Sequence, residues 1–361
     1  MRARLDTART VLVPYVVSRV VVVGALLTIR HVISVQHFAE PVQTRDGLLA
    51  WDGAWYRDIA RHGYDVVHAR EGLRFFPLFP LLARLVAVAP GVSAGAGVVI
   101  VANVFAFVLG MVVYQLAMHE RADAALARRA VWLLYLVPPA YVLVLGYAEA
   151  LFMTAAALVL LTLRQRRWWI AAVAGFAAGL TRPVGALLAV PAAIEGVQQR
   201  DARAIAPAAA PVAGMLAYLL YANSKAHDFL APLRLQQDAV RRGAWVDPFR
   251  AVAHNVHELF SGDHVSAGIH VISALVFAGL LIQLARRWPL SFTVYAAVSL
   301  FVALSSKNLD SLERYGLATV PFVLAGADLL RTDERERVVL TLAAAGLIAA
   351  AILAFTGVLV P

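Results

Sequence analysis

The stretch WDGAWYRDIARHGY, Trp51 to Tyr64, and the FFPLFP that follows at Phe75 to Pro80 form a polar interruption in an apolar chain. Of the 361 residues, 61% are hydrophobic, and long apolar runs recur from end to end. This share is far above that of a soluble domain. Because lipid tolerates no unpaired backbone N–H or C=O group, each long run is expected to be a helix. The chain is therefore predicted to be an all-α polytopic membrane protein.

The number of membrane spans follows from the lengths of the apolar runs. A hydrocarbon core about 30 Å thick requires about 17 to 25 helical residues. The first run is longer than a signal-peptide core and lacks a cleavage pattern of small residues, so a retained helix is expected. About eleven runs qualify, some of them short: 11–29, 95–118, 130–146, 148–163, 168–181, 183–197, 204–224, 266–284, 288–304, 315–330 and 339–358.

Short basic connections between these runs predict the topology. Cytoplasmic loops carry an excess of Lys and Arg, and with this set of spans all the short basic clusters fall on one side of the membrane. A multi-pass protein of the plasma (inner) membrane is predicted, with its N-terminus in the cytoplasm and its C-terminus outside. The clusters are Arg2/Arg4/Arg9, Arg121/Arg128/Arg129, Arg164/Arg166/Arg167, Arg200/Arg203, Arg286/Arg287 and Arg331/Arg335/Arg337.

Residues 30–94 are expected to form one long external loop. This topology requires that the segment at 75–90 does not cross the membrane. The segment carries Pro77 and Pro80 near its start and Arg84 in its middle, where a lipid-facing charge would cost several kcal/mol. Two helices that lie along the membrane surface are predicted in this loop instead.

The sequence also limits the partners and the chemistry. No soluble domain or repeat is evident, so residues 1–361 are predicted to form a single membrane domain, with a second external loop at 225–265. The net charge of +9 lies in short clusters between apolar runs, which favours membrane lipids over nucleic acid. Cysteine, glycine-rich phosphate loops, HExxH and GxSxG are absent, which argues against thiol, nucleotide, zinc-protease and serine-hydrolase chemistry. His254 and His257 have the spacing of many solvated loop histidines, so no metal and no cofactor are predicted.

Three charged residues at predicted helix ends are candidates for chemistry. Asp52 is either a helix N-cap or a catalytic base, and spacing alone favours neither. Glu149 starts an apolar run, either as an acid stabilised by the helix dipole or as an acceptor for substrate hydroxyls. Arg182 lies between two apolar runs, and intramembrane ionisable residues are functional candidates, so a phosphate or sugar contact is favoured over a structural ion pair.

Two features within the apolar runs are expected to be structural. Gly175 and Gly179 have the small-xxx-small spacing of closely packed membrane helices. Arg19 lies in the cytoplasmic half of the first run and is expected to snorkel to the inner interface. No role in chemistry is therefore assigned to these residues.

Five segments of the sequence resemble one family of membrane enzymes. WDGAWYRDIARHGY with FFPLFPLL is similar to the first-loop signature of the PIG-V-like mannosyltransferases, members of the GT-C class of integral membrane glycosyltransferases. The segments PPAYVLVLGYAEALF, GLTRPVG, HDFLAPLRLQQ and RYGLATVPFVLA resemble later segments of that family in the same order. The resemblance covers most of the chain. It is specific because all five segments occur in the same order as in the family.

The resemblance implies a GT-C-like fold and an inverting transfer of a sugar, mannose in this family, on the extracytoplasmic face. The implied donor is a polyprenyl-phosphate-linked sugar, and the implied acceptor is a glycolipid or glycan. Asp52 matches the first-loop aspartate regarded as the base of GT-C enzymes, and Arg182 matches the arginine of the TRP segment. Further expected site residues are Arg234, Lys307 and Arg314 for the donor phosphate, and Trp51, Tyr56, Tyr64, Glu149, His227, Asp228 and Gln237 for the substrates.

The residues alone leave two other function classes open. A lipid phosphate is a competent leaving group, so a transferase needs chiefly one base and cations that stabilise the departing phosphate. A lipid or solute transporter should instead carry ionisable relays at mid-bilayer and repeated halves, whereas here the ionisable residues lie mostly at helix ends. A non-catalytic scaffold would not require the carboxylate of Asp52.

Overall fold

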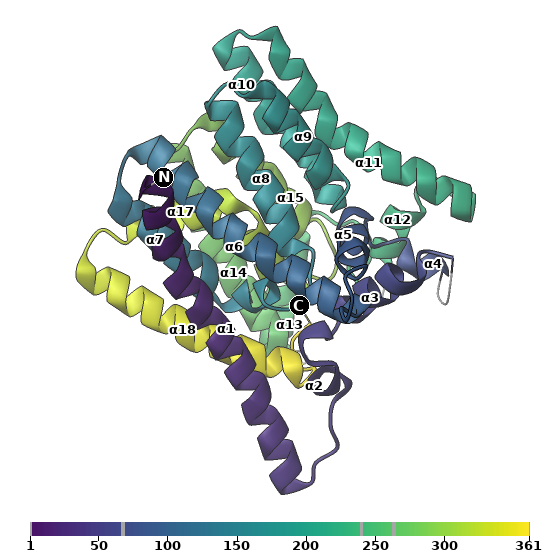
Figure 1. Ribbon diagram of the computed structural model, residues 1–361. Helices are drawn as coiled ribbons and strands as arrows, with labels where there is room; N and C mark the ends of the chain where they lie inside the picture. The colour runs from purple at the N-terminus through teal and green to yellow at the C-terminus, as the bar shows by residue number, and fades with distance from the viewer. Residues whose placement is uncertain (1, 66–68, 239–240, 262–264, 361) are drawn as a thin grey trace. The chain divides into compact units, whose positions relative to one another are not determined.

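The computed structural model describes residues 2–65, 69–238, 241–261 and 265–360. Helix accounts for 80% of the chain, and these ranges contain no strand. Figure 1 labels the helices in chain order. The chain divides into two compact units, each with its own internal packing.

Unit 1 contains both ends of the chain and comprises Met1–Gly63, Leu78–Ala157 and Gly326–Pro361. Within it, α1 and α18 lie side by side (Figure 1). Its elements are α1 (Arg2–Gln36), α2 (Val42–Asp46), the 3-10 helix η1 (Gly47–Leu49), α3 (Asp52–His62), α5 (Leu78–Val86), α6 (Ala94–Arg121), α7 (Ala124–Leu136), η2 (Pro138–Leu143), the first part of α8 (Glu149–Arg164), the end of α17 (Val320–Leu329) and α18 (Asp333–Phe355).

Unit 2 comprises Tyr64–Pro77 and Leu158–Ala325. Within it, α9 and α11 lie side by side (Figure 1). Besides the remaining parts of α8 and α17, its elements are α4 (Ala69–Gly72), α9 (Trp168–Gly179), η3 (Pro183–Leu188), α10 (Ala189–Gln199), η4 (Ala202–Ala204), α11 (Ile205–Ala226), α12 (Ala231–Arg234), η5 (Leu235–Gln237), α13 (Pro248–Ser261), α14 (Val265–Arg287), α15 (Leu290–Leu304) and α16 (Leu312–Ala318).

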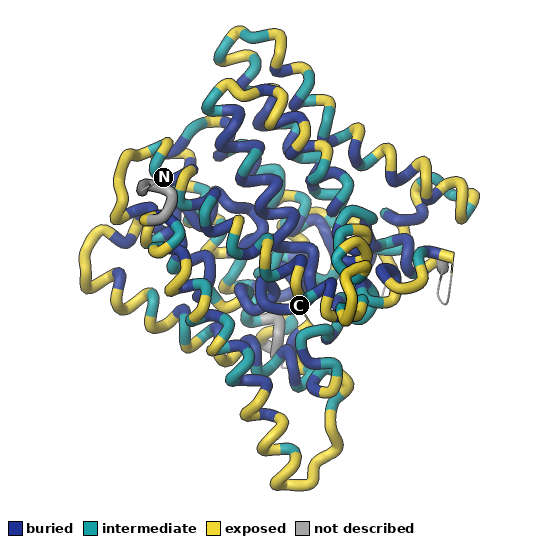
Figure 2. The backbone as a smooth tube through the Cα atoms, viewed as in Figure 1, coloured by how far each residue is buried: buried dark blue, intermediate teal, exposed yellow. Residues whose placement is uncertain are grey.

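Several helices have the length and surface of membrane spans. In the described part of the chain, five are long and apolar enough to cross a bilayer: Asp6–Gln36, Ala94–Arg121, Ala202–Ala226, Gly268–Arg287 and Asp333–Phe355. Large apolar side chains are exposed along them, among them Val20, Leu220 and Leu342, and Figure 2 shows exposed positions along the same helices. Such surfaces are suited to lipid rather than to water. The predicted all-α polytopic membrane protein is thus confirmed.

Three predicted spans are divided rather than continuous. The run at 130–146 forms α7 and then η2, because the residue before a proline is forced out of the helical region. Val137, which precedes Pro138, accordingly adopts φ −58° and ψ 148°. The run at 183–197 forms η3 and α10, and the run at 315–330 forms α16 and α17. The total of about eleven spans stays a prediction.

The side chain of Arg19 forms hydrogen bonds inside the protein, at the end of η2. The prediction that it snorkels to the inner interface was therefore wrong. Its Nη2 donates to the carbonyl of Leu143 at 2.7 Å, and its Nε donates to Asn103 Oδ1 at 3.1 Å. Asn103 Nδ2 in turn donates to the carbonyl of Val144 at 3.0 Å. The guanidinium also lies 3.7 Å above the ring of Tyr15. Unpaired carbonyls are costly inside a membrane protein, and these two side chains satisfy those at the end of η2.

Gly175 and Gly179 allow α9 to approach α11 closely, as predicted. A Cβ added at Gly175 would lie 2.8 Å from Pro211 Cγ, and one at Gly179 would collide with the Pro211 carbonyl oxygen. On the opposite side, a Cβ at Gly214 would collide with the carbonyl oxygen of Phe176. The small residues therefore serve helix packing.

Among the helices of residues 30–94, α3 and α5 lie where the two surface helices were predicted, and their position at the membrane surface stays a prediction. α5 has nine residues, so it is about 13 Å long at 1.5 Å per residue. That is less than half of a hydrocarbon core about 30 Å thick. The segment between these helices belongs to unit 2, where the Tyr218 hydroxyl donates to the carbonyls of Leu73 at 2.8 Å and Phe75 at 3.0 Å. The loop is thus divided between the two units.

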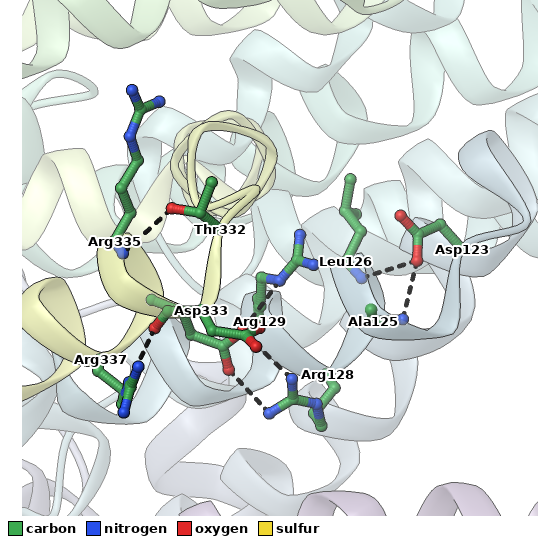
Figure 3. Close-up of polar contacts among 10 residues, drawn as sticks. Asp123, Ala125, Leu126, Arg128, Arg129, Thr332, Asp333, Arg335 and Arg337 are labelled. Atoms are coloured by element: carbon green, nitrogen blue, oxygen red, sulfur yellow. Dashed lines mark hydrogen bonds and ion pairs between the residues drawn. The ribbon is translucent and has the colours of Figure 1, made fainter.

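A buried ion pair joins α7 to the first turn of α18 (Figure 3). Arg128 Nη1 lies 2.8 Å from Glu336 Oε1, and Arg129 Nε lies 3.1 Å from Glu336 Oε2. The side chains of Arg129 and Glu336 are only 14% and 10% exposed. Asp123 caps α7 by accepting from the backbone N–H groups of Ala125 and Leu126.

Glu336→Gln is expected to destabilise the protein by about 3 kcal/mol, because it leaves the buried guanidinium of Arg129 without its counter-charge. Thermal unfolding in detergent measures this loss as a lower Tm. Arg335→Gln is the matched control on the same helix, since Figure 3 shows the Arg335 side chain pointing away from Arg128 and Arg129. Equal Tm values for Glu336→Gln and Arg335→Gln would contradict the assigned role of the pair.

Candidate active site

Asp52 lies in the first turn of α3 and not at its N-cap. The N-cap is Trp51, with φ +60° and ψ −119°. A bulky residue at positive φ is strained by about 1–3 kcal/mol, and such strain persists only where the surroundings enforce it. The N-cap alternative for Asp52 is therefore wrong by position. A carboxylate in the first turn is stabilised by the helix dipole.

The start of α3 docks on the turn that precedes α8. The backbone N–H of Asp52 lies 3.3 Å from the hydroxyl oxygen of Tyr147, which accepts it, and the N–H of Gly146 donates to the carbonyl of Leu48 at 2.8 Å. A Cβ at Gly146 would lie 2.5 Å from Val98 Cγ1, and one at Gly53 would lie 3.4 Å from the Gly146 carbonyl oxygen. Two glycines thus permit the close approach.

Glu149 begins α8 two residues after Tyr147. Its side chain is buried, with 2% exposure, and the Tyr147 side chain is fully buried. Asp52 and Glu149 therefore lie in the first turns of two helices whose starts are joined through Tyr147. Within unit 1, the structure brings these two predicted acids to the same corner.

A cationic cluster in unit 2 surrounds the ring of Tyr315 on α16. Arg182 Cζ lies 5.2 Å from the ring centroid, and Arg242 Cζ lies 4.5 Å from it. Arg242 Nη2 also donates to the carbonyls of Ala303 at 2.9 Å and Val302 at 3.3 Å, at the end of α15. Cation–π contact holds both guanidinium groups against the ring. We call Arg182, Arg242 and Tyr315 the Tyr315 cluster.

Lys307 and Arg314 are connected to the Tyr315 cluster through the backbone. The N–H of Lys307 donates to the carbonyl of Ala244 at 3.1 Å, and the N–H of Asn308 donates to that of Arg242 at 3.0 Å. Gly243, with φ +67°, makes this pairing possible, since a Cβ there would lie 3.1 Å from Lys307 Cβ. Arg314 directly precedes Tyr315 in α16.

Residues 13–190 match the family model described as mannosyltransferase (PIG-V). This segment belongs to the PIG-V mannosyltransferase family. Family membership implies a glycosyltransferase with a sugar donor and an acceptor. No curated protein matches the chain. The matched segment includes Asp52, Tyr147, Glu149 and Arg182, whereas Arg242 and Tyr315 lie beyond it.

The aromatic residues predicted to contact substrate have contacts within the protein. Trp51 Nε1 donates to the carbonyl of Ala354 at 2.9 Å, near the end of α18. Tyr56 packs edge-on against Phe79, with ring centroids 4.8 Å apart. Tyr64 donates to the carbonyl of Phe75 at 2.7 Å, and burial raises the pKa of its hydroxyl well above the usual value. Their predicted contacts with substrate stay predictions.

The remaining predicted site residues lie beyond the matched segment, at the end of α11 and in the segment after it. Arg234 Nη1 lies 3.0 Å from both carboxylate oxygens of Asp228, so a phosphate would compete with Asp228 for these N–H groups. His227, with φ +51°, is the C-cap of α11. Gln237 is exposed in η5. The substrate roles of these residues stay predictions.

Of the two histidines considered as metal ligands, His254 has another partner. His254 Nε2 lies 3.2 Å from Glu258 Oε1 on α13. No group of three His, Asp or Glu side chains among the described residues is arranged to hold a metal ion. The prediction that the reaction needs no metal or cofactor stays a prediction.

Arg242 belongs to the Tyr315 cluster but stands outside the phosphate-binding set expected from the sequence, which was Arg182, Arg234, Lys307 and Arg314. It lies in the RRG triplet of a long loop, beside Arg241, which pairs with Glu71 instead. The only local signal is Gly243, whose positive φ allows the backbone pairing that directs Arg242 toward α15. Its contact with Tyr315 joins segments far apart in the chain, and no local pattern encodes it.

Proposed function

We propose that the protein is an inverting glycosyltransferase that moves mannose from a polyprenyl-phosphate-linked donor to an extracytoplasmic glycolipid or glycan. One observation carries the proposal: Asp52 lies in the first turn of α3, docked on Tyr147 beside Glu149, inside the segment that belongs to the PIG-V family. A carboxylate at a rigid helix start is suited to act as a general base. Asp52 is the proposed base.

The proposed reaction needs one base and a stabilised leaving group. The acceptor hydroxyl attacks C1 of the mannosyl group as the bond from C1 to the phosphate oxygen breaks. The electron pair of that bond leaves with the polyprenyl phosphate, and the acceptor proton passes to Asp52. As the attacking oxygen gains positive character, its proton becomes acidic enough for a carboxylate to accept. Attack opposite the leaving group inverts the anomeric centre.

The donor phosphate is proposed to bind the cations of unit 2. Arginine forks form strong paired hydrogen bonds to phosphate, and preorganised cations stabilise its developing charge. Arg182 is the principal candidate, with Lys307 and Arg314, and the geometry adds Arg242. Arg234 stays a proposal that requires release of Asp228. Glu149, His227 and Asp228 are proposed to position sugar hydroxyls, together with Trp51, Tyr56, Tyr64 and Gln237.

The proposed architecture is GT-C-like, with about eleven spans, a cytoplasmic N-terminus and the active site on the extracytoplasmic face of the plasma (inner) membrane. The shortness of α5 supports it, because a crossing there would move every later basic loop to the outside.

Because the chain has no cysteine, single-cysteine labelling tests this topology directly. Ala89→Cys, in the first external loop, is expected to react with an impermeant maleimide added to intact cells stripped of their wall. Ala125→Cys, in the first turn of α7, is expected to react only after permeabilisation. Both positions are exposed in the structure. The reverse pattern would overturn the proposed orientation.

Mass analysis of lipid-linked glycans in a strain lacking the protein tests the function. A glycan shortened by one hexose should accumulate, and wild-type protein but not Asp52→Asn should restore the full length. Unchanged glycans would contradict the proposal. A reconstituted protein that moved lipid across vesicles without glycosyl transfer would be a transporter instead.

A further inference from the structure

A buried histidine on α14 lies between two carboxylates. The side chain of His270 is 3% exposed. Its Nδ1 lies 3.0 Å from Glu313 Oε1, and its Nε2 lies 3.5 Å from Asp310 Oδ1. Glu313 is in the first turn of α16, and Asp310 precedes that helix. One side chain of α14 thus contacts both the start of α16 and the loop before it.

The two carboxylates favour a charged imidazole ring, with Nδ1 at hydrogen-bond distance from Glu313 and Nε2 at ion-pair distance from Asp310. A neutral histidine has one N–H donor, whereas the imidazolium has two, and here an acceptor oxygen faces each nitrogen. Of the helices packed against α14, α15 has no charged side chain, α16 carries Arg314 next to Glu313, and the His254 and Glu258 side chains of α13 pair with each other. The other charged or titratable side chains described on α13 are those of Arg250 and His257.

The ion pairs fix the helix that carries Tyr315. Glu313 is two residues before Tyr315 in the same short helix. A second contact holds α16 against α14, because a Cβ at Gly316 would collide with the ring of Phe277. Leu312, one residue before Glu313, belongs to a buried apolar cluster against which Phe277 and Tyr315 pack. The Tyr315 ring therefore has a position set by α14, and Arg182 and Arg242 contact that ring.

We propose that His270 is a positioning residue for the donor phosphate: through Glu313 and Asp310 it holds α16 so that Tyr315 orients Arg182 and Arg242. This inference rests on the proposed transfer from a lipid phosphate. His270 does not touch the substrate; its effect is exerted through the Tyr315 cluster. A small displacement of a binding group far from the reacting atoms is enough to impair binding strongly.

The test is steady-state transfer from mannosyl polyprenyl phosphate by purified protein in vesicles. His270→Gln is expected to raise KM for the donor about 10-fold while kcat changes less than about twofold. Asp310→Asn, at the half-exposed partner, should raise KM by a smaller factor with little effect on folding. Because His270 acts through Glu313, the double variant with Glu313→Gln should be no worse than the more impaired single variant. His254→Gln, an exposed ion-paired histidine on α13, is the matched control with unchanged KM.

The outcomes separate this inference from the proposed function. If wild-type protein transfers mannose but KM is unchanged in both His270→Gln and Asp310→Asn, His270 is not a positioning residue. A fall in kcat at constant KM means only a loss of folded protein, which also overturns the inference. If wild-type protein shows no transfer from the lipid donor, the proposed function itself fails.

Discussion

Asp52→Asn is expected to lower kcat for mannosyl transfer by about 10²- to 10⁴-fold, the usual contribution of a general base. Asparagine has nearly the same shape as aspartate, and the backbone N–H that donates to Tyr147 is retained. The docking of α3 should therefore survive, and KM for the donor should change little. Steady-state transfer by purified variants in vesicles measures both constants.

Asp58→Asn is the matched control for this prediction. Asp58 lies on the same helix six positions later, its side chain is 57% exposed, and it pairs with Arg57 at 2.8 Å. Surface ion pairs contribute about 0–1 kcal/mol to stability, so its activity should stay near that of the wild type. A comparable loss in Asp58→Asn and Asp52→Asn would indicate damage to α3 rather than removal of a base.

Arg182→Gln and Arg242→Gln are each expected to lower kcat/KM for the donor by about 10- to 150-fold, because a hydrogen bond to a charged group contributes about 1.5–3 kcal/mol. Arg182→Lys should recover only part of the loss, since an ammonium cannot form the paired contacts of a guanidinium. Transfer rates measured over a range of donor concentrations give these ratios.

Arg250→Gln, an exposed position on α13, is the control for removal of a positive charge, and its kcat/KM should stay near that of wild type. The variant Arg242→Gln is the more informative of the two, because Arg242 lies outside the family-matched segment and its proposed role rests on geometry alone. If Arg242→Gln has the kinetics of the wild type, Arg242 does not bind the donor phosphate. This result would not bear on Arg182.

The sequence predicted those parts of the fold that depend on local composition. The change from apolar to polar at Trp51 predicted α3, and the prolines of FFPLFP with Arg84 predicted a segment that does not span, where α5 has nine residues. Small residues spaced by four predicted close helix packing, and the structure shows that α11 is the partner of α9. These features are encoded within one or two helical turns.

Features that depend on distant partners could not be predicted in this way. Arg19 is paired with the carbonyl of Leu143, 124 residues away, and a hydropathy pattern contains no information on that contact. His270 lies in an apolar run whose carboxylate partners follow one helix later. In the same way, the contact between Arg242 and Tyr315 depends on the packing of α15 and α16.

The proposed site residues include both kinds, those that the sequence revealed and those that only the structure shows. Asp52 and Arg182 were found because each is a charge where the chain is otherwise apolar. Tyr147 was not, because a tyrosine in a buried run has the pattern of ordinary core, and only the structure shows its hydroxyl next to the Asp52 N–H. Its position beside Glu149 strengthens the assignment of this corner of unit 1 to chemistry.

The most direct measurement of the central claim is transfer of labelled mannose by purified protein in vesicles, supplied in parallel with mannosyl polyprenyl phosphate and with nucleotide-linked mannose. The account predicts incorporation from the lipid donor only, with inversion at the anomeric carbon and loss of transfer in Asp52→Asn. Transfer from the nucleotide donor, or transfer at the wild-type rate by Asp52→Asn, would contradict it.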